Sequence, residues 1–124
     1  MKLSEAIRLG STLSQQAHYI TFIWNQGQTE ILNACALGAA WHAAGLSHLL
    51  KNGALFYQHH QMFPIIDKAV IHPKEPNKAH TVMSTIISLN DEYNLTREVI
   101  ADWVESVEIQ LAQQEQQKEL VHAS

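Results

Sequence analysis

The chain has 124 residues, of which 46% are hydrophobic and 16% are charged. This composition excludes an intrinsically disordered chain, and the length predicts one domain. The formal net charge of −4 is unevenly distributed, because residues 90–124 hold eight acids and two bases, whereas residues 1–89 hold four acids and six bases. The C-terminal third is therefore an acidic pole, which either steers a basic partner or is simply solvated.

The N-terminal part predicts one helix followed by an irregular connection. Apolar residues from Leu3 onward recur at helical spacing, with Ser4 as the cap and an end near Ser14. The segment 18–24 is rich in β-branched and aromatic residues, which favour strands, but no clear partner strand follows it. It is therefore interpreted either as a short strand or as an extended packing segment.

Small side chains dominate the segment 30–44, which predicts a central helix that another backbone can approach closely. Leu37 and Trp41 are one helical turn apart and supply its bulk. Gly45 is placed to end this helix in a left-handed conformation.

The middle of the chain predicts two shorter helices and a loop. The helical segments are 46–52 and 54–62, and Pro64 ends the second of them. The segment 72–80 contains two prolines together with clustered Lys and Asn residues. These residue types favour turns, so this segment is predicted to be the most mobile internal loop.

A helical hairpin is predicted near the C-terminus, with Thr81 as the cap of its first helix and Thr96 as the cap of its second. The apolar stripe of the second helix ends near Leu111, so residues 1–112 are predicted to form a single helical domain and residues 113–124 a polar, fraying tail. The expected fold class is mainly α, a bundle of four to five helices with an irregular N-terminal connection. The apolar faces of the hairpin are Val82, Ile86 and Leu89 in the first helix, and Val99, Ile100, Trp103, Val104, Val107 and Leu111 in the second.

The solvent side of the second helix is predicted to be an acidic face. A helix that reads DNA needs positive charge against the phosphates, so no nucleic acid is expected on this helix. The face is instead predicted to bind a protein partner with a basic surface, and the small core of such a chain favours a homodimer. The residues of the acidic face are Glu98, Asp102, Glu105 and Glu108.

Cys35 is the single cysteine, so an intrachain disulfide is excluded and a reducing compartment fits best. If Asn33 caps the central helix, Cys35 lies in its first turn, where the helix dipole stabilises a thiolate. This placement is the basis of one alternative, a small thiol-dependent enzyme. The favoured interpretation is that Cys35 is a small, shielded residue at a close helix crossing.

The eight histidines raise the alternative of a metal site. Such a site needs three or four converging ligands, commonly with one pair at helical or strand spacing, and no two histidines have that spacing. A site made of His59, His60, His72 and His80 would therefore have to be assembled by the fold. Ordinary histidines are the favoured interpretation, no cofactor is expected, and the loop from His72 to His80 should titrate freely near neutral pH.

No stretch approaches the roughly 20 apolar residues that a membrane span requires, so no membrane association is expected. The segment Met1-Lys2-Leu3-Ser4-Glu5 has no hydrophobic signal core. The expected location is the cytoplasm, and export by a route that needs no signal peptide stays open.

Three segments together carry a resemblance: residues 1–10 (MKLSEAIRLG), residues 35–40 (CALGAA) and residues 89–105, which contain Leu-Asn-Asp, Thr-Arg-Glu and Ile-Ala-Asp-Trp-Val-Glu. They resemble a group of small uncharacterised bacterial and phage-associated proteins. Members of that group often have a Cys-x-x-Cys pair before the helix that leads into Leu-Asn-Asp, where this chain has His72 and His80. The resemblance therefore implies a common fold, without a thiolate metal site or an activity to carry over.

The function predicted from these observations is that of a non-enzymatic protein-binding or regulatory module. The acidic face and the exposed aromatic residues are its expected contact surfaces. A thiol-dependent enzyme that uses Cys35 is the first alternative, and a histidine-based metal-binding protein is the second.

Overall fold

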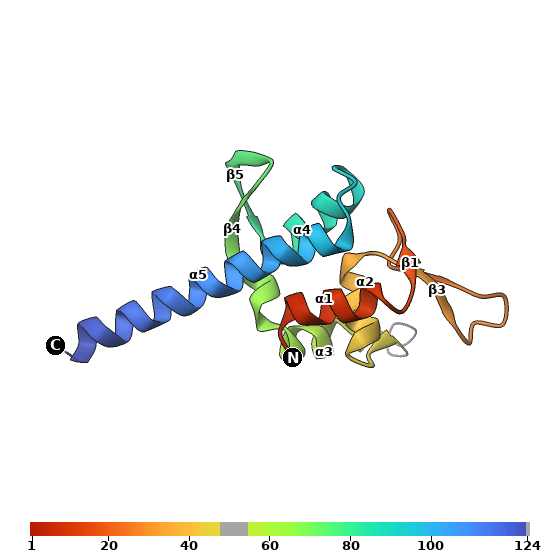
Figure 1. Ribbon diagram of the computed structural model, residues 1–124, viewed down its shortest axis with the longest axis horizontal. Coiled ribbons are helices and arrows are strands. Elements are labelled where there is room, and N and C mark those ends of the chain that lie inside the picture. Colours follow the sequence, from red (N-terminus) through yellow and green to blue (C-terminus); the bar gives the residue numbers. More distant parts are fainter. Residues whose placement is uncertain (48–54, 124) are drawn as a thin grey trace.

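The computed structural model describes residues 1–47 and 55–123 (Figure 1). Within these residues it has five α-helices and two small β-sheets, so the prediction of a mainly α bundle is wrong and the fold is mixed α/β. Most of the helix predicted over 46–52 lies outside the described residues. The elements in chain order are α1 (Leu3–Ser11), β1 (Gln15–Gln16), β2 (Phe22–Trp24), β3 (Ile31–Ala34), α2 (Ala36–Ala43), α3 (Leu55–Met62), the 3-10 helix η2 (Pro64–Asp67), β4 (Ala69–His72), β5 (Glu75–Thr81), α4 (Val82–Asp91) and α5 (Arg97–Ala123).

The first sheet replaces the N-terminal part of the predicted central helix. Its strand order is β1-β3-β2, with β1 parallel and β2 antiparallel to β3. Asn25 explains the turn between β2 and β3, because its Oδ1 accepts hydrogen bonds from the backbone N–H groups of Thr29 (2.8 Å) and Glu30 (3.2 Å). The chain thereby returns on itself, and β3 becomes the partner strand that the sequence did not reveal.

The second sheet is the hairpin of β4 and β5, which occupies the segment predicted to be a mobile loop. Val70 pairs with His80 and Ile71 with Ala79, so the loop prediction over 72–80 is wrong. A two-stranded sheet leaves one edge of each strand without a ladder, and such an edge tolerates a proline like Pro76 in β5.

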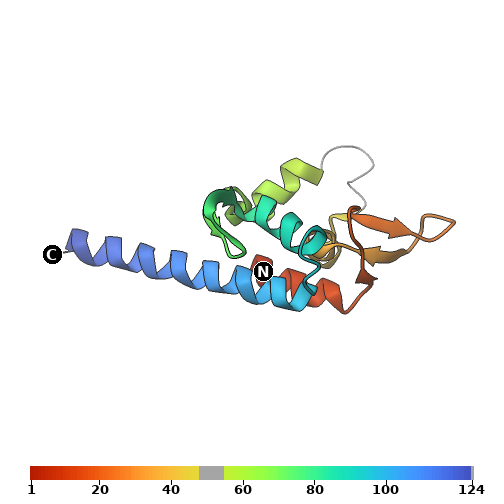
Figure 2. The ribbon, with the colours of Figure 1, turned by 90° about the horizontal axis from the view of Figure 1, so that it is seen from above.

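Helix α1 packs against both α2 and α5 (Figure 2). Its approach to α2 is close, since a Cβ added at Gly10 would lie 1.8 Å from the carbonyl oxygen of Ala39. This close approach is what the small residues of that segment predicted. The helix ends at Ser11 and not near Ser14, and Lys2 stands at its N-cap where Ser4 was expected.

The predicted caps of α4 and α5 are both present. Thr81 forms a reciprocal capping box with Ser84, and the hydroxyl of Thr96 accepts a hydrogen bond from the backbone N–H of Val99 (3.2 Å). The side chain of Val99 is nevertheless 47% exposed, although the spacing placed it on the apolar stripe. Helices α4 and α5 do contact each other, but α5 packs more extensively on α1.

The core lies among α1, α2, α4 and α5, with the first strands at one end. Leu37 and Trp41 are buried as predicted, and Gly45 follows α2 with φ 75°, in the left-handed conformation that the sequence indicated. Trp103 is only half-buried at the margin of this core. The large side chains buried almost completely include Leu3, Ile7, Phe63, Ile66, Ile86, Leu89, Ile100 and Val104.

Helix α5 leaves the body of the molecule and projects toward the C-terminus (Figures 1 and 2). The polar tail predicted from residue 113 continues this helix to Ala123 and is exposed as far as its side chains are described. None of the helices in the described parts of the chain combines the length and the hydropathy that crossing a bilayer requires.

Candidate functional site

Asn90 ties three distant segments together beneath a surface pocket. Its Oδ1 accepts hydrogen bonds from Nε2 of Gln16 (2.9 Å) and from the backbone N–H of Ala36 (3.1 Å). Its Nδ2 donates to the carbonyl oxygen of Ala17 (2.9 Å) and to Oδ1 of Asp91 (2.7 Å). Because Asn90 is only 1% exposed, these bonds fix where α2 begins relative to α4.

Arg97, the first residue of α5, binds the end of α1 and the first sheet through its guanidinium. Its guanidinium donates to the backbone carbonyl oxygens of Ser11, Ser14, Gln15 and Ala34, and to the hydroxyl of Ser14. Burial lowers the pKa of Arg97, but an arginine stays charged in a protein. The sequence indicated Thr96 as a cap and gave no sign that the next residue would bind the first sheet.

A pocket of about 270 Å³ opens beside this framework, between the segment before β2 and the helices α2 and α4. Its inner wall includes Cys35 and the side chains of Leu37 and Trp41. Its rim carries exposed apolar groups, namely Tyr19 (78% exposed), Ile20 (52%) and Ile87 (45%). The pocket is thus mostly apolar, and Asn90 and Asp91 supply its polar end.

Asp91 holds the rim in place. Its Oδ1 accepts a hydrogen bond from the backbone N–H of Tyr19 (2.9 Å), a residue with the left-handed φ of 64° that is uncommon outside glycine. Within residues 1–47 and 55–123 no donor reaches the other carboxylate oxygen, Oδ2. One oxygen of Asp91 therefore positions the rim, and the other accepts no hydrogen bond from the described residues.

Cys35 lines this pocket as a protonated thiol. It stands at the N-cap of α2, where its Sγ accepts a hydrogen bond from the backbone N–H of Gly38 (3.3 Å), while Asn33 belongs to β3 and caps nothing. Burial raises the pKa of the Cys35 thiol, and the hydrogen bond from Gly38 lowers it by less. The described lining of the pocket contains no histidine to act as a base. The geometry therefore does not favour the thiol-enzyme alternative.

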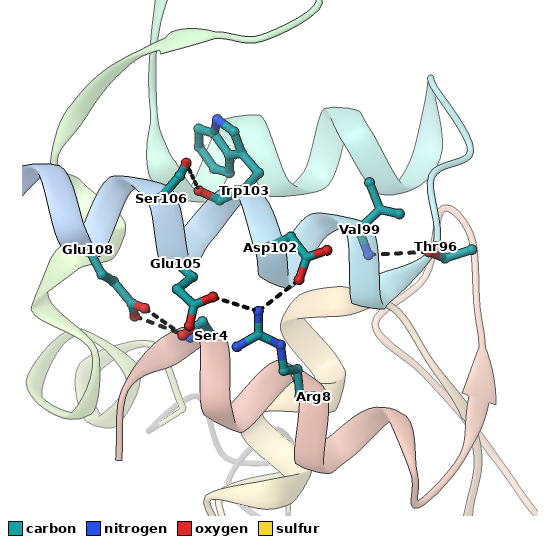
Figure 3. A network of polar contacts seen from close by, with 9 residues as sticks. All are labelled: Ser4, Arg8, Thr96, Val99, Asp102, Trp103, Glu105, Ser106 and Glu108. Atoms are coloured by element: carbon teal, nitrogen blue, oxygen red, sulfur yellow. Dashed lines mark hydrogen bonds and ion pairs between the residues drawn. The ribbon is translucent and has the colours of Figure 1, made fainter.

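Three residues of the predicted acidic face contact α1 through their carboxylates (Figure 3). Nη2 of Arg8 donates to Oδ1 of Asp102 (2.8 Å) and to Oε2 of Glu105 (3.0 Å), and these bonds raise the pKa of Arg8. Glu108 accepts hydrogen bonds from the backbone N–H (3.2 Å) and the hydroxyl of Ser4. Asp102 (72% exposed side chain), Glu105 (49%) and Glu98 nevertheless remain exposed.

Carboxylates of the acidic face thus bind residues of α1 in the same chain. Exposed ion pairs contribute little stability, so the pairs of Arg8 orient α1 along α5 more than they stabilise it. Trp103 points to the opposite side of the helix, as the spacing indicated (Figure 3). Binding of a basic partner by Glu98, Asp102, Glu105 and Glu108 stays a prediction.

His72 is fully buried between the hairpin and α4, and it belongs to β4 and not to the predicted loop. Its Nδ1 accepts a hydrogen bond from the backbone N–H of Lys74 (3.0 Å), so the neutral ring carries its proton on Nε2. Nε2 lies 2.9 Å from Oγ of Ser88 and 3.5 Å from Oε2 of Glu75. A protonated Nε2 donates to Ser88 and cannot take its proton, so this pair is not an activated nucleophile.

The four histidines of the metal alternative lie in two places. His72 and His80 have ring centroids 5.1 Å apart on the β4–β5 hairpin, whereas His59 and His60 belong to α3. Nδ1 of His60 lies 2.7 Å from Oδ2 of Asp67. In the part of the chain that the structure describes, no three His, Cys, Asp or Glu side chains gather closely enough to hold an ion.

His59 is buried between the rings of Trp41 and Phe63, with centroid distances of 4.7 Å and 5.5 Å. Both of its ring nitrogens lack a hydrogen-bond partner among the described residues. Burial, aided by the nearby charge of His60, lowers the pKa of His59 to about 4. The ring is therefore neutral in the folded protein at physiological pH.

We expect His59 to make the fold sensitive to acid. In the unfolded chain His59 takes up a proton near its ordinary pKa of about 6.5, whereas in the folded protein it stays neutral down to about pH 4. The free energy of unfolding is therefore unaffected by His59 above pH 6.5 and decreases as the pH falls from 6.5 toward 4. The loss should reach about 3 kcal/mol, measured by urea unfolding between these pH values. His59→Phe should remove most of this pH dependence, whereas His60→Phe should not. An equal acid response in His59→Phe would contradict the assignment.

Comparison of the chain with protein-family models, with curated proteins and with solved structures finds no match. The resemblance to small bacterial and phage-associated proteins therefore stays a prediction.

Proposed function

We propose that this protein is a non-enzymatic binding module that takes one apolar side chain of a partner protein into the pocket beside Cys35. The observation that carries the proposal is that three exposed apolar residues, Tyr19, Ile20 and Ile87, line a mostly apolar cavity. Exposed apolar groups that surround a hollow are a common mark of a protein contact site.

The size of the pocket favours a side chain over a whole small molecule. Pockets for cofactors and drug-sized ligands usually measure about 300–1,000 Å³, and this one measures about 270 Å³. One large aliphatic or aromatic side chain would fill it. Such anchors in preformed pockets dominate the energy of many interfaces.

The charges around the pocket favour a basic residue next to the anchor. Asp91 presents one carboxylate oxygen to which none of the described residues donates, and the exposed Glu92 follows it. The acidic pole of the chain would attract the same kind of partner over a longer range. We infer that the partner segment places Lys or Arg beside its apolar residue.

The framework under the pocket supports binding without rearrangement. Asn90 and Arg97 hold the first sheet, α2 and α5 in fixed positions through buried hydrogen bonds. A preformed site loses less entropy when a partner binds. The cytoplasm, where a single thiol such as Cys35 stays reduced, is the setting that we propose.

Selection of peptides from a random displayed library tests this function. Enriched peptides should share one large apolar residue next to Lys or Arg, with dissociation constants of about 1–100 μM. Ile87→Glu places a charge on the rim and should weaken binding by about tenfold or more. Ile109→Glu changes an isoleucine of similar exposure (52%) on α5, outside the pocket, and should leave binding unchanged.

Two further measurements locate the peptide. Asp91→Asn keeps the oxygen that accepts from Tyr19 but removes the charge, so it should weaken basic peptides selectively and reduce their salt dependence. Alkylation of Cys35, the single thiol, should slow when the peptide fills the pocket. Peptides without an apolar anchor, or binding unaffected by Ile87→Glu, would contradict the proposal.

A further inference from the structure

One side of α5 carries a stripe of residues spaced alternately by four and three positions, which we call the α5 stripe. The first part of the stripe faces a groove of about 400 Å³ whose opposite wall is the β4–β5 hairpin, through Ala69, Val70, Ile71 and Ala79. The second part lines a hollow of about 370 Å³ on the projecting end of the helix. The residues of the α5 stripe are Trp103, Val107, Gln110, Gln114, Gln117 and Val121.

We propose that a second copy of this chain covers the α5 stripe, with the two α5 helices antiparallel about a two-fold axis near residue 112. Alternating spacings of four and three read the same in both directions. Reversal therefore places Trp103 opposite Val121, Val107 opposite Gln117, and Gln110 opposite Gln114 of the second copy. The spacing of the stripe therefore matches its own reversal, as an isologous interface requires, and Val107 contributes little to the exposed surface because it is only 6% exposed.

The lengths of the two parts agree with this arrangement. The groove extends along α5 from Trp103 to Gln114, and the projecting end covers 113–123, so one spans twelve positions and the other eleven. At a rise of about 1.5 Å per residue, the contact from Trp103 to Val121 is about 27 Å long. The end of each helix would therefore fill the groove of the other copy.

The chemistry along the stripe suits a helix more than a flat surface. Ile71, 65% exposed on the hairpin, and the half-buried Trp103 would enclose Val121 of the second copy. Gln110 and Gln114 carry amides that both donate and accept, so they can pair with each other across the axis. Polar residues at such central positions fix register at a cost in affinity.

This surface lies outside the pocket beside Cys35, since the two share no lining residue. The inference therefore does not depend on the proposed function. A dimer would present two pockets at once, and a partner with two anchors would bind it with increased avidity.

Sedimentation of the full chain over a concentration series tests the interface, with two adjacent substitutions as a matched pair. Val121 and Leu120 are 64% and 67% exposed, but only Val121 belongs to the α5 stripe. The wild type should dimerise, and Val121→Asp should weaken the dimer by about tenfold or more. Leu120→Asp should leave the dissociation constant of the dimer within about twofold of the wild-type value. A monomeric wild type, or equal effects of the two substitutions, would overturn the proposal.

Disulfide formation distinguishes antiparallel from parallel pairing. In a Cys35→Ala background, a mixture of Gln110→Cys and Gln114→Cys chains should form cross-linked heterodimers on mild oxidation, because these positions face each other. Gln114→Cys alone should cross-link poorly. Efficient cross-linking of Gln114→Cys with itself would indicate parallel helices and overturn the arrangement.

Discussion

Replacing Arg97 with methionine should destabilise the protein by about 4 kcal/mol or more, since each buried acceptor that loses its donor costs about 1–3 kcal/mol. The methionine keeps much of the apolar stem but has no donor. The carbonyl oxygens of Ser11, Ser14, Gln15 and Ala34 would then lose a charged partner at a site where Arg97 is only 7% exposed. Urea unfolding followed by circular dichroism measures the difference.

Arg8 supplies the matched control for this substitution. It also bridges distant residues, Asp102 and Glu105, but its side chain is 35% exposed and its partners are carboxylates that water can solvate. Arg8→Met should therefore change stability by no more than about 1 kcal/mol. If Arg97→Met cost no more than Arg8→Met, the guanidinium would not be what joins α5 to the first sheet.

The features that could be predicted from the sequence are those decided within a few residues. Thr81 and Thr96 cap their helices because each hydroxyl accepts a hydrogen bond from the backbone N–H only three positions further along the chain. Gly45 ends α2 because the left-handed conformation is a property of the residue itself. Local patterns of this kind fixed α4 and the start of α5 correctly.

The strands could not be predicted, because their residue types are atypical of strands and the segments with which they pair do not show in the local sequence. Ile31–Ala34 reads as the beginning of an alanine-rich helix, and only its ladders with β1 and β2 make it a strand. The segment that forms the hairpin of β4 and β5 contains two prolines and clustered Lys and Asn residues, which indicated a loop. Tertiary pairing overrode local propensity in both places.

The candidate site was visible only in fragments. Cys35 was identified, but the pocket around it joins residues from before β2, from α2 and from α4, and no spacing in the sequence brings Tyr19 to Ile87. The acidic face was identified as a surface, yet Arg8 and Ser4, which reach it, are more than 90 positions away. The roles of Asn90 and Arg97 depend equally on distant carbonyl groups.

Gly10→Ala should destabilise the protein by about 2–3 kcal/mol, and Gly10→Val should do so by more, as overpacking at a close crossing does. The added Cβ would lie 1.8 Å from the carbonyl oxygen of Ala39 and 2.8 Å from its Cα, so α1 must move away from α2. Alanine is intrinsically better than glycine in a helix by about 1 kcal/mol, which makes a net loss all the more informative. Thermal and urea unfolding measure it.

Gly27→Ala is the control, because the nearest group to a Cβ added there is the hydroxyl of Thr29 at 3.9 Å. The stability of the Gly27→Ala protein should stay within about 1 kcal/mol of the wild type. The displacement of α1 in Gly10→Ala should also reach the sheet, since Ser11 and Ser14 follow the glycine and bind Arg97. Double substitution at Gly10 and Arg97 should therefore cost less than the sum of the single effects. Full additivity, or a Gly10→Ala protein as stable as the wild type, would show that α1 and α2 are not in close contact.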